Sequence, residues 1–206
     1  MTRTVVHLLR HGEVHNPDDV LYGRMPGFRL SDLGEQMAVQ AAKWLAGRDI
    51  TLVRSSPLER ARQTAQPVAD TLGLPTPEVD ERLIESANVF EGSRGGWRKP
   101  SNWRYLTNPM RPSWGEPYRE VADRVLAACA DARDAAVGHE VVLVSHQLPI
   151  WVTRLAAANQ RLWHRPDRRM CALASITSFT YADGQIVQIG YVEPAGPVGR
   201  RTIGGA

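Results

Sequence analysis

Two histidines stand at positions where an α/β protein can use them for chemistry. The segment "VVHLLRHGEVHNP" (residues 5–17) is a short apolar run that ends in Arg10, His11 and Gly12. A second apolar run, "VLVSHQ", leads directly into His146. Ligands of open α/β sheets bind beyond the carboxyl ends of the strands. Two buried strands that each end in a histidine can therefore place two imidazoles at one edge of a sheet.

Arginines lie between these histidines in the chain. Arg60 and Arg62 belong to "SPLERARQT", which is predicted to begin a helix. The N-terminus of a helix attracts anions, and an arginine there can complete an anion pocket. Side chains two positions apart on a helix point in different directions, so we expect only one of the two to face such a pocket. These residues indicate an anion site at the edge of the sheet.

The hydrophobic pattern places these residues on alternating strands and helices, which predicts an α/β layer fold. Ser31 is the predicted N-cap of the first helix, and Ser56 with Glu59 forms a predicted capping box for the second. A hairpin is expected to turn near Asp183-Gly184. Strands are predicted at "TVVHLL", "ITLVRSS" and "EVVLVS", and helices at "LSDLGEQMAVQAAKWLAG", "SPLERARQTAQPVADTLG", "PYREVADRVLAACADARDAA" and "PIWVTRLAAA".

The length of 206 residues suits one domain, which we expect to span residues 1–193, with a flexible Gly/Pro-rich tail at 194–206. Residues 86–117 have no steady period and are expected to form a long surface excursion. This excursion is either a lid over an anionic substrate, an ordinary surface loop or a homodimer surface. Its basic and aromatic residues are Arg94, Trp97, Arg98, Lys99, Trp103, Arg104, Tyr105, Arg111 and Trp114.

Composition excludes several other classes of protein. The N-terminal apolar run is too short for a signal peptide, and no run has the length of a transmembrane helix. Cys129 and Cys171 lie in apolar surroundings, as free buried thiols do, so we expect a cytoplasmic protein. The net charge of +3 is scattered along the chain, so neither nucleic acid nor a membrane is an expected partner.

Four motifs in order, "LLRHGE", "SSPLERARQTA", "DERLIESANVFEG" and "VLVSHQ", resemble those of the histidine phosphatase superfamily, also called the phosphoglycerate mutase-like family. The segment "YGRMPGFRLSDLGEQMA" follows the same pattern, so the resemblance covers nearly the whole chain. It implies an α/β fold, a three-layer α/β/α sandwich with a mostly parallel central sheet.

The resemblance also implies the roles of individual residues. His11 is the nucleophile that becomes a transient phosphohistidine, and Gly12 lets the backbone approach closely behind it. Arg10 and Arg60 hold the phosphoryl oxygens by charge-assisted hydrogen bonds. His146 is a further donor to those oxygens. Asn16, Tyr22, Gly23 and Gln147 match positions that bind the substrate or its phosphate; Gln147 replaces a usually small residue and either contacts the substrate or crowds the pocket.

Glu85 matches the family's proton donor. Such a carboxyl must be protonated for the leaving alkoxide and deprotonated to activate water, so its pKa is expected to be raised. The pattern after it, "ANVFEG", departs from the family's at Asn88 and Phe90, which leaves Glu91 as the alternative acid. No metal is expected, because arginines and imidazoles supply the positive charge.

The sequence therefore predicts a phosphomonoester hydrolase acting on a small phosphorylated metabolite. The chain is shorter than cofactor-dependent phosphoglycerate mutases usually are and lacks their acid-site pattern, so mutase activity is the alternative. Only a mutase needs a cofactor here, 2,3-bisphosphoglycerate. A third possibility is a module that binds a phosphorylated ligand without turnover, against which the intact set of site residues argues.

Overall fold

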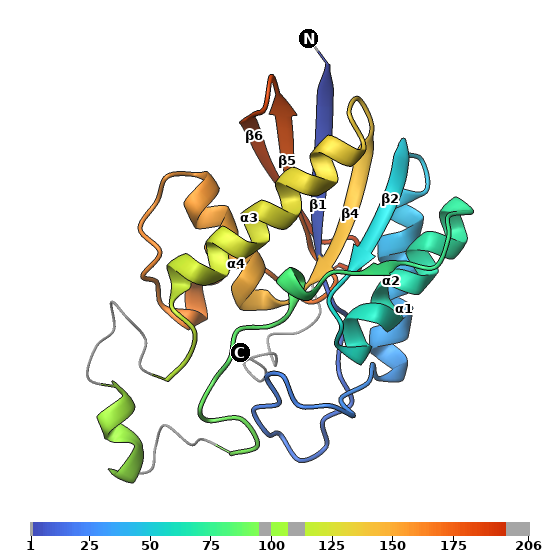
Figure 1. The fold of residues 1–206 in the computed structure, drawn as a ribbon. Coiled ribbons are helices and arrows are strands. Elements are labelled where there is room, and N and C mark those ends of the chain that lie inside the picture. Colours follow the sequence, from blue (N-terminus) through green and yellow to red (C-terminus); the bar gives the residue numbers. More distant parts are fainter. Residues whose placement is uncertain (1, 95–99, 107–113, 197–206) are drawn as a thin grey trace.

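The computed structural model describes residues 2–94, 100–106 and 114–196, and Figure 1 shows their arrangement. The strands are β1 (Arg3–Arg10), β2 (Ile50–Ser55), β3 (Glu78–Val79), β4 (Glu140–Ser145), β5 (Ile176–Ala182) and β6 (Gln185–Val192). The α-helices are α1 (Asp32–Leu45), α2 (Glu59–Leu72), α3 (Tyr118–Ala135) and α4 (Gln147–Ala157). Short 3-10 helices are η1 (Glu81–Leu83), η3 (Pro100–Leu106) and η4 (Pro166–Arg168).

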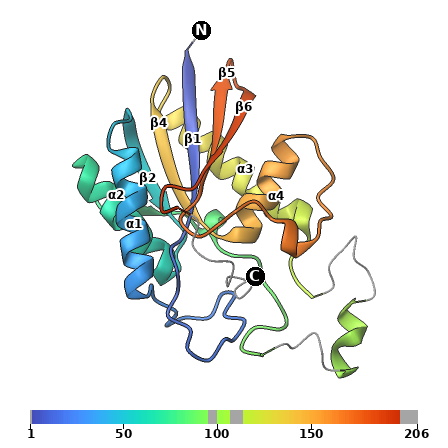
Figure 2. The same ribbon diagram turned by 180° about the vertical axis from the view of Figure 1, so that it is seen from behind.

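These strands form one sheet in the order β3-β2-β4-β1-β5-β6. The first four are parallel to one another. At one edge of the sheet, β5 pairs antiparallel with β1, and β6 pairs antiparallel with β5. Helices α1 and α2 cover one face of the sheet and α3 and α4 the other, as the two opposite views show (Figures 1 and 2). The predicted three-layer sandwich with a mostly parallel sheet is confirmed.

The central pair, β1 and β4, sets the position of both histidines. Their parallel register pairs Arg10 with Ser145, the last residue of each strand. His11 and His146 are the next residues along, and the His11 amide donates to the Ser145 carbonyl over 3.1 Å. Both histidines therefore leave the sheet side by side at its carboxyl edge.

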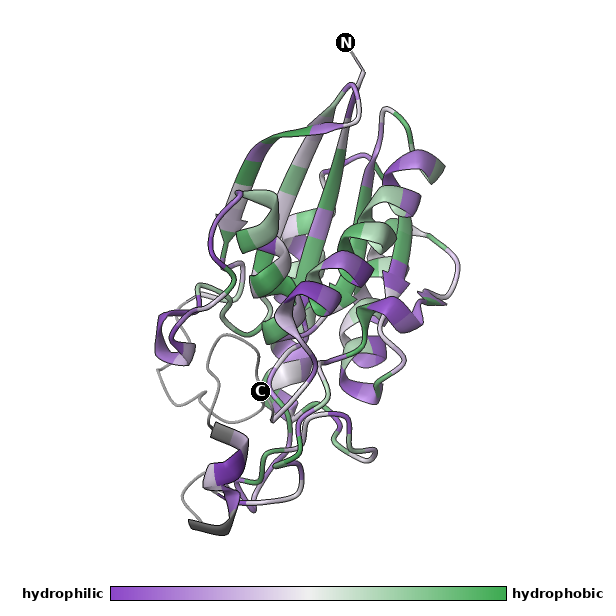
Figure 3. Ribbon diagram, turned by 60° about the vertical axis from the view of Figure 1, so that its left-hand side comes forward, coloured by the Kyte–Doolittle hydropathy of each residue, from purple (hydrophilic) through white to green (hydrophobic). Residues whose placement is uncertain are grey.

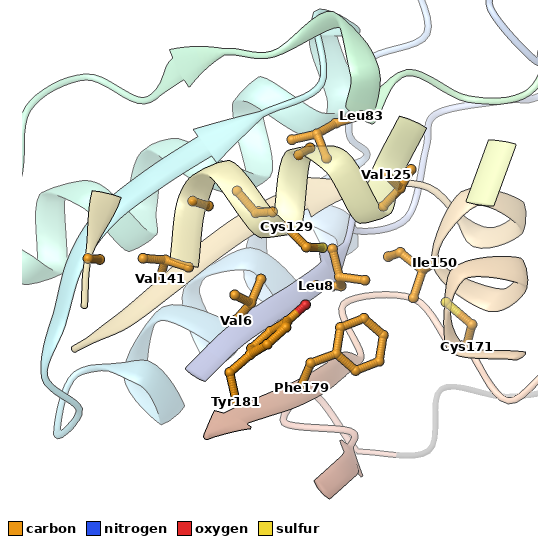
Figure 4. Packing of buried hydrophobic residues seen from close by; sticks show 14 residues of the cluster. Val6, Leu8, Leu83, Val125, Cys129, Val141, Ile150, Cys171, Phe179 and Tyr181 are labelled. Atoms are coloured by element: carbon orange, nitrogen blue, oxygen red, sulfur yellow. The ribbon is translucent and has the colours of Figure 1, made fainter. Parts of the chain in front are cut away.

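The sheet is held between two hydrophobic clusters. On the side of α3, Val6, Leu8 and Phe179 pack against that helix, as Figure 4 shows. On the side of α1 and α2, Leu9 and Val144 pack against small helix residues. The central strand β4 has the near-continuous buried apolar run expected of a strand covered on both faces, and Figure 3 shows hydrophobic stretches along the strands of the sheet. A close-packed interior resists rearrangement: replacing one buried Leu with Ala lowers the free energy of unfolding by about 2–5 kcal/mol. This packing keeps the strand ends at fixed positions.

Of the predicted helix caps and the predicted hairpin turn, some are confirmed by the structure and one is wrong. Ser31 caps α1 as predicted, accepting from the Gly34 amide over 3.0 Å. The capping box predicted at Ser56 is wrong, because α2 begins at Glu59 without a side-chain cap and the Ser56 hydroxyl pairs with His146 instead. The hairpin turn is confirmed: Asp183 and Gly184 both have positive φ, as a type I′ turn requires.

The excursion predicted at residues 86–117 is described in part. Its two ends meet in a bridge between Asn88 and Gly115, and η3, which the sequence pattern did not predict, packs Tyr105 edge-on against Phe90. Trp103 on η3 is 60% exposed. Of its predicted basic and aromatic residues, four lie outside the described residues, as does most of the tail: Trp97, Arg98, Lys99 and Arg111. Within the described ranges, no helix is both long and apolar enough to cross a membrane.

Candidate active site

His11 is buried at the carboxyl end of β1, with 2% of its surface exposed. Its Nδ1 lies 2.7 Å from the Gly12 carbonyl, which can only accept, so Nδ1 carries the proton and Nε2 carries the lone pair. Burial, reinforced by the charges of Arg60 and Arg10, lowers the pKa of His11 well below its ordinary value of 6.5. The imidazole is therefore neutral at physiological pH, the form that a nucleophile requires.

Two buried arginines flank this imidazole. The Arg10 guanidinium donates from one Nη to the Cys171 carbonyl over 2.7 Å, and Arg60 donates to the Gly23 carbonyl over 2.6 Å. The Nε atoms of both are buried without a hydrogen-bond partner among the described residues. Arg62, two positions beyond Arg60, is exposed. Only one arginine of this helix thus joins the site.

His146 completes the cluster from the start of α4. Its ring centre is 5.1 Å from that of His11, and its Nε2 lies 2.7 Å from Ser56 Oγ. Burial lowers its pKa well below the ordinary value, so this ring is also neutral. Its buried Nδ1 has no partner in the described part of the chain. With the Ser56 hydroxyl assigned as donor to Nε2, Nδ1 carries the ring proton and joins the two arginine Nε–H groups as a buried donor, a set that suits an anion.

Gly12 connects the histidine loop, residues 11–13 after β1, to helices α1 and α2. A Cβ on Gly12 would lie 2.4 Å from the Gly34 carbonyl oxygen, so no other residue fits there. Its amide donates to Thr64 Oγ1 over 3.1 Å, and that hydroxyl donates to the Arg60 carbonyl over 2.7 Å. This chain of contacts fixes His11 relative to the helical turn that carries Arg60.

Glu85 follows η1 and is the buried carboxyl of the site, with 2% exposure. Burial raises its pKa above the ordinary value of 4.5, while the Ser86 amide and the charges of Arg60, Arg169 and Arg10 act against that rise. Arg24 donates to the Glu85 carbonyl over 2.6 Å and fixes its backbone. A carboxyl balanced in this way can both give and take a proton.

Glu91, the alternative acid, lies differently. Its Oε1 accepts from the Asn88 amide over 3.3 Å. A Cβ on Gly23 would come within 2.2 Å of that same oxygen. The carboxyl of Glu91 therefore packs against the backbone that holds Arg60, and the geometry favours Glu85 as the acid.

The residues matched to substrate binding fall into two groups. Tyr22 is buried with Arg60 4.8 Å above its ring, and the Gly23 carbonyl accepts from Arg60, so both residues position that guanidinium. Asn16 instead closes its own loop: its Nδ2 donates to the Val20 carbonyl over 2.9 Å, and its Oδ1 accepts from the Val20 amide over 3.2 Å. In the described structure, no contact joins Asn16 to the His11 cluster.

Gln147, the first residue of α4, uses both ends of its amide within the protein. It donates to the Cys171 carbonyl at 3.4 Å and accepts from Arg169 at 3.1 Å. Arg169, like Ser56, Thr64 and Arg24, was missed by sequence reasoning. The only signal for Arg169 was the basic run near η4, which is typical of an exposed surface.

Comparison with known proteins identifies the family of the chain. The family model of the histidine phosphatase superfamily (branch 1) matches residues 6–193. The chain is 53% identical to the uncharacterized protein Rv0525 of Mycobacterium tuberculosis (strain ATCC 25618 / H37Rv), with 93% of this chain and 97% of that one covered. It is 30% identical to the probable phosphoglycerate mutase GpmB of Salmonella choleraesuis (strain SC-B67), with 94% and 93% covered.

A solved structure of the mycobacterial glucosyl-3-phosphoglycerate phosphatase Rv2419c superposes with a TM-score of 0.72 at 26% identity, with 92% of this chain and 96% of that one covered. The fold, the order of the motifs and the family match all agree. The chain belongs to the histidine phosphatase superfamily.

Proposed function

We propose that this protein is a phosphomonoester hydrolase that acts on a small phosphorylated metabolite through a phosphohistidine intermediate. The observation that carries the proposal is a neutral imidazole, His11, with its lone pair on Nε2. It lies beside two buried guanidiniums and the Nδ1 of His146, which has no partner in the described part of the chain. These donors match the oxygens of a phosphoryl group, and the imidazole matches an in-line nucleophile.

In the first step, Arg10, Arg60 and His146 donate to the phosphoryl oxygens. The lone pair of His11 Nε2 attacks phosphorus, the bond to the ester oxygen breaks, and Glu85 gives its proton to that oxygen. The products are the free alcohol, a phosphohistidine and a Glu85 carboxylate. The guanidiniums offset the charge that builds on the equatorial oxygens.

In the second step, the Glu85 carboxylate takes a proton from water as the water oxygen attacks phosphorus. The P–N bond breaks, and its electron pair returns to His11 Nε2. Inorganic phosphate leaves, and both His11 and Glu85 regain their starting protonation states. The raised pKa of Glu85 suits it to both steps.

The similarity to a mycobacterial glucosyl-3-phosphoglycerate phosphatase supports hydrolysis, whereas the similarity to the probable phosphoglycerate mutase GpmB supports the alternative of mutase-type transfer with 2,3-bisphosphoglycerate. We further propose a cytoplasmic location, which the two buried free cysteines, Cys129 and Cys171, support.

The decisive experiment is to trap the intermediate. Protein mixed with a phosphorus-labelled phosphomonoester and quenched rapidly should carry acid-labile, base-stable label, and p-nitrophenyl phosphate should be hydrolysed. His11→Ala should remove the label and slow hydrolysis by about 10³-fold or more. His15→Ala, which changes an exposed neighbouring histidine, is the matched control and should keep both.

Three outcomes separate the alternatives. Label and turnover that survive His11→Ala refute the nucleophile. Interconversion of 3- and 2-phosphoglycerate that depends on 2,3-bisphosphoglycerate and exceeds hydrolysis identifies a mutase. Tight phosphate binding without hydrolysis of any phosphomonoester identifies a binding module.

A further inference from the structure

Arg169 is a half-buried cation beside the site that the proposed mechanism does not use. It follows η4 and makes no ion pair with a carboxylate among the described residues. Burial lowers its pKa, as it does for Arg60. A desolvated guanidinium without a carboxylate is costly, which is typical of residues kept to bind an anion.

Two side chains hold Arg169 in one orientation. Its Nε donates to His164 Nε2 over 2.9 Å, and one Nη donates to Gln147 Oε1 over 3.1 Å. His164 is itself fixed, since its Nδ1 donates to the Leu162 carbonyl over 2.7 Å and its ring packs on Tyr118 at 5.3 Å. A guanidinium has five N–H donors, so three remain available for a ligand.

The same contacts connect Arg169 to the phosphoryl site. Gln147 follows His146 directly and donates to the Cys171 carbonyl over 3.4 Å, and this carbonyl also accepts from Arg10 over 2.7 Å. Arg10 and Arg169 are thus linked through the Cys171 carbonyl and the side-chain amide of Gln147.

Arg169 also lies near enough to Glu85 to act on its carboxyl. Its charge opposes the rise in the pKa of that carboxyl. In an in-line transfer the nucleophile and the leaving oxygen are on opposite sides of phosphorus. Glu85 serves the leaving oxygen, so Arg169 lies beside the alcohol half of the substrate.

We propose that Arg169, oriented by Gln147 and His164, binds a second anionic group on the alcohol half of the substrate, and so selects phosphomonoesters that carry a carboxylate near the ester. One guanidinium with a free edge matches a carboxylate by a bidentate pair. This inference rests on the proposed function of the neighbouring site.

The test uses binding, so that it reports even if turnover is absent. In His11→Ala protein, calorimetry compares 3-phosphoglycerate with glycerol 3-phosphate, which differ only by a carboxylate in place of a hydroxymethyl group. We expect the carboxylate ligand to bind about 10- to 100-fold more tightly. Adding Arg169→Gln should reduce this ratio to about 3-fold or less, whereas Arg168→Gln, an exposed neighbour, should preserve it.

A second variant guards against a folding effect. Arg169→Lys keeps the charge without the planar fork and should give an intermediate ratio. Propane-1,3-diol bisphosphate tests phosphate as the second group: binding tighter than that of 3-phosphoglycerate, abolished by Arg169→Gln, would identify a phosphate subsite and overturn the choice of a carboxylate. Equal affinities for all three ligands, binding of none of them, or a preference that survives Arg169→Gln overturns it. Failure of the proposed function is distinct, because it appears as absent turnover in the wild-type protein.

Discussion

The hydroxyl of Ser56 lies 2.7 Å from Nε2 of His146 and joins two strand ends that meet only in the folded protein. Ser56 follows β2 and His146 follows β4, its parallel neighbour. The Leu58 amide donates to Ser56 Oγ over 3.4 Å. We assign the hydroxyl proton to the contact with His146 Nε2, because the other ring nitrogen has no partner in the described structure and is left to donate to a ligand. This contact leaves the proton of the imidazole on Nδ1, where it can face a phosphoryl oxygen.

Ser56→Ala should therefore weaken catalysis, because the His146 ring is no longer held in the tautomer that carries its proton on Nδ1. A lost buried hydrogen bond is equivalent to about 1–3 kcal/mol, so kcat/KM for p-nitrophenyl phosphate should fall about 5- to 150-fold. Ser55→Ala is the matched control, since Ser55 Oγ is buried without a partner in the described structure. Equal kinetics for the two variants would show that Ser56 has no part in orienting His146.

Glu85→Gln should discriminate between leaving groups. Hydrolysis of an alkyl phosphate needs a proton on the leaving oxygen, whereas p-nitrophenolate leaves with little help. The variant should slow formation of the phosphoenzyme about 10²- to 10⁴-fold for alkyl esters and much less for aryl esters, measured by rapid quench. Glu91→Gln provides the comparison. If Glu91→Gln instead shows this selective loss, the acid is Glu91.

The pH profile should be bell-shaped for an alkyl phosphate. His11 must be neutral, and its pKa is lowered, so activity rises with pH at values well below 6.5. Glu85 must be protonated in the first step, and its pKa is raised, so activity declines with pH only above 4.5. Glu85→Gln should remove the declining limb. A profile that keeps this limb in the variant assigns the titration to another group.

Two glycines should differ sharply in their tolerance of a methyl group. A Cβ on Gly34 would lie 2.0 Å from the Glu13 carbonyl oxygen, whereas nothing lies within 4 Å of one on Gly47. Gly34→Ala should lower the free energy of unfolding by about 1–3 kcal/mol or more through overpacking, and Gly47→Ala should change it by less than about 1 kcal/mol. Urea unfolding monitored by circular dichroism measures both. Equal stabilities would mean that the histidine loop yields to the extra methyl.

Activity should be independent of divalent metal. Arg10 and Arg60 place fixed positive charge at the site, and within the described ranges no three His, Cys, Asp or Glu side chains form a group suited to a metal ion. Dialysis against EDTA should leave kcat unchanged within error. Loss of activity that added Mg²⁺ or Zn²⁺ restores would require a different mechanism.

The sequence predicted the elements well because their signals are local. Apolar runs locate β1 and β4, and their ends at Arg10 and Ser145 place both histidines at one edge. The predicted cap at Ser56 failed because a serine before a helix has the same local signature whether it caps that helix or bonds a distant ring. The partner, 90 positions away, is set by the order of strands in the sheet.

Arg169 could not be predicted for a related reason. In the chain it stands among Arg165, Arg168 and Met170, a pattern typical of a solvent-facing turn. Only the fold brings it against Gln147 and the packed ring of His164, and its desolvation follows from those long-range contacts.

Because Arg10 pairs with Ser145, the proposed activity depends on the correct register between β1 and β4. Side chains alternate across a strand, so a slip of β1 by a single residue against β4 would send the two imidazoles to opposite faces of the sheet. A protein with such a slip would keep its helices and much of its burial, yet lose its phosphoryl pocket. Activity is thus a far finer measure of correct folding in this chain than its helical content.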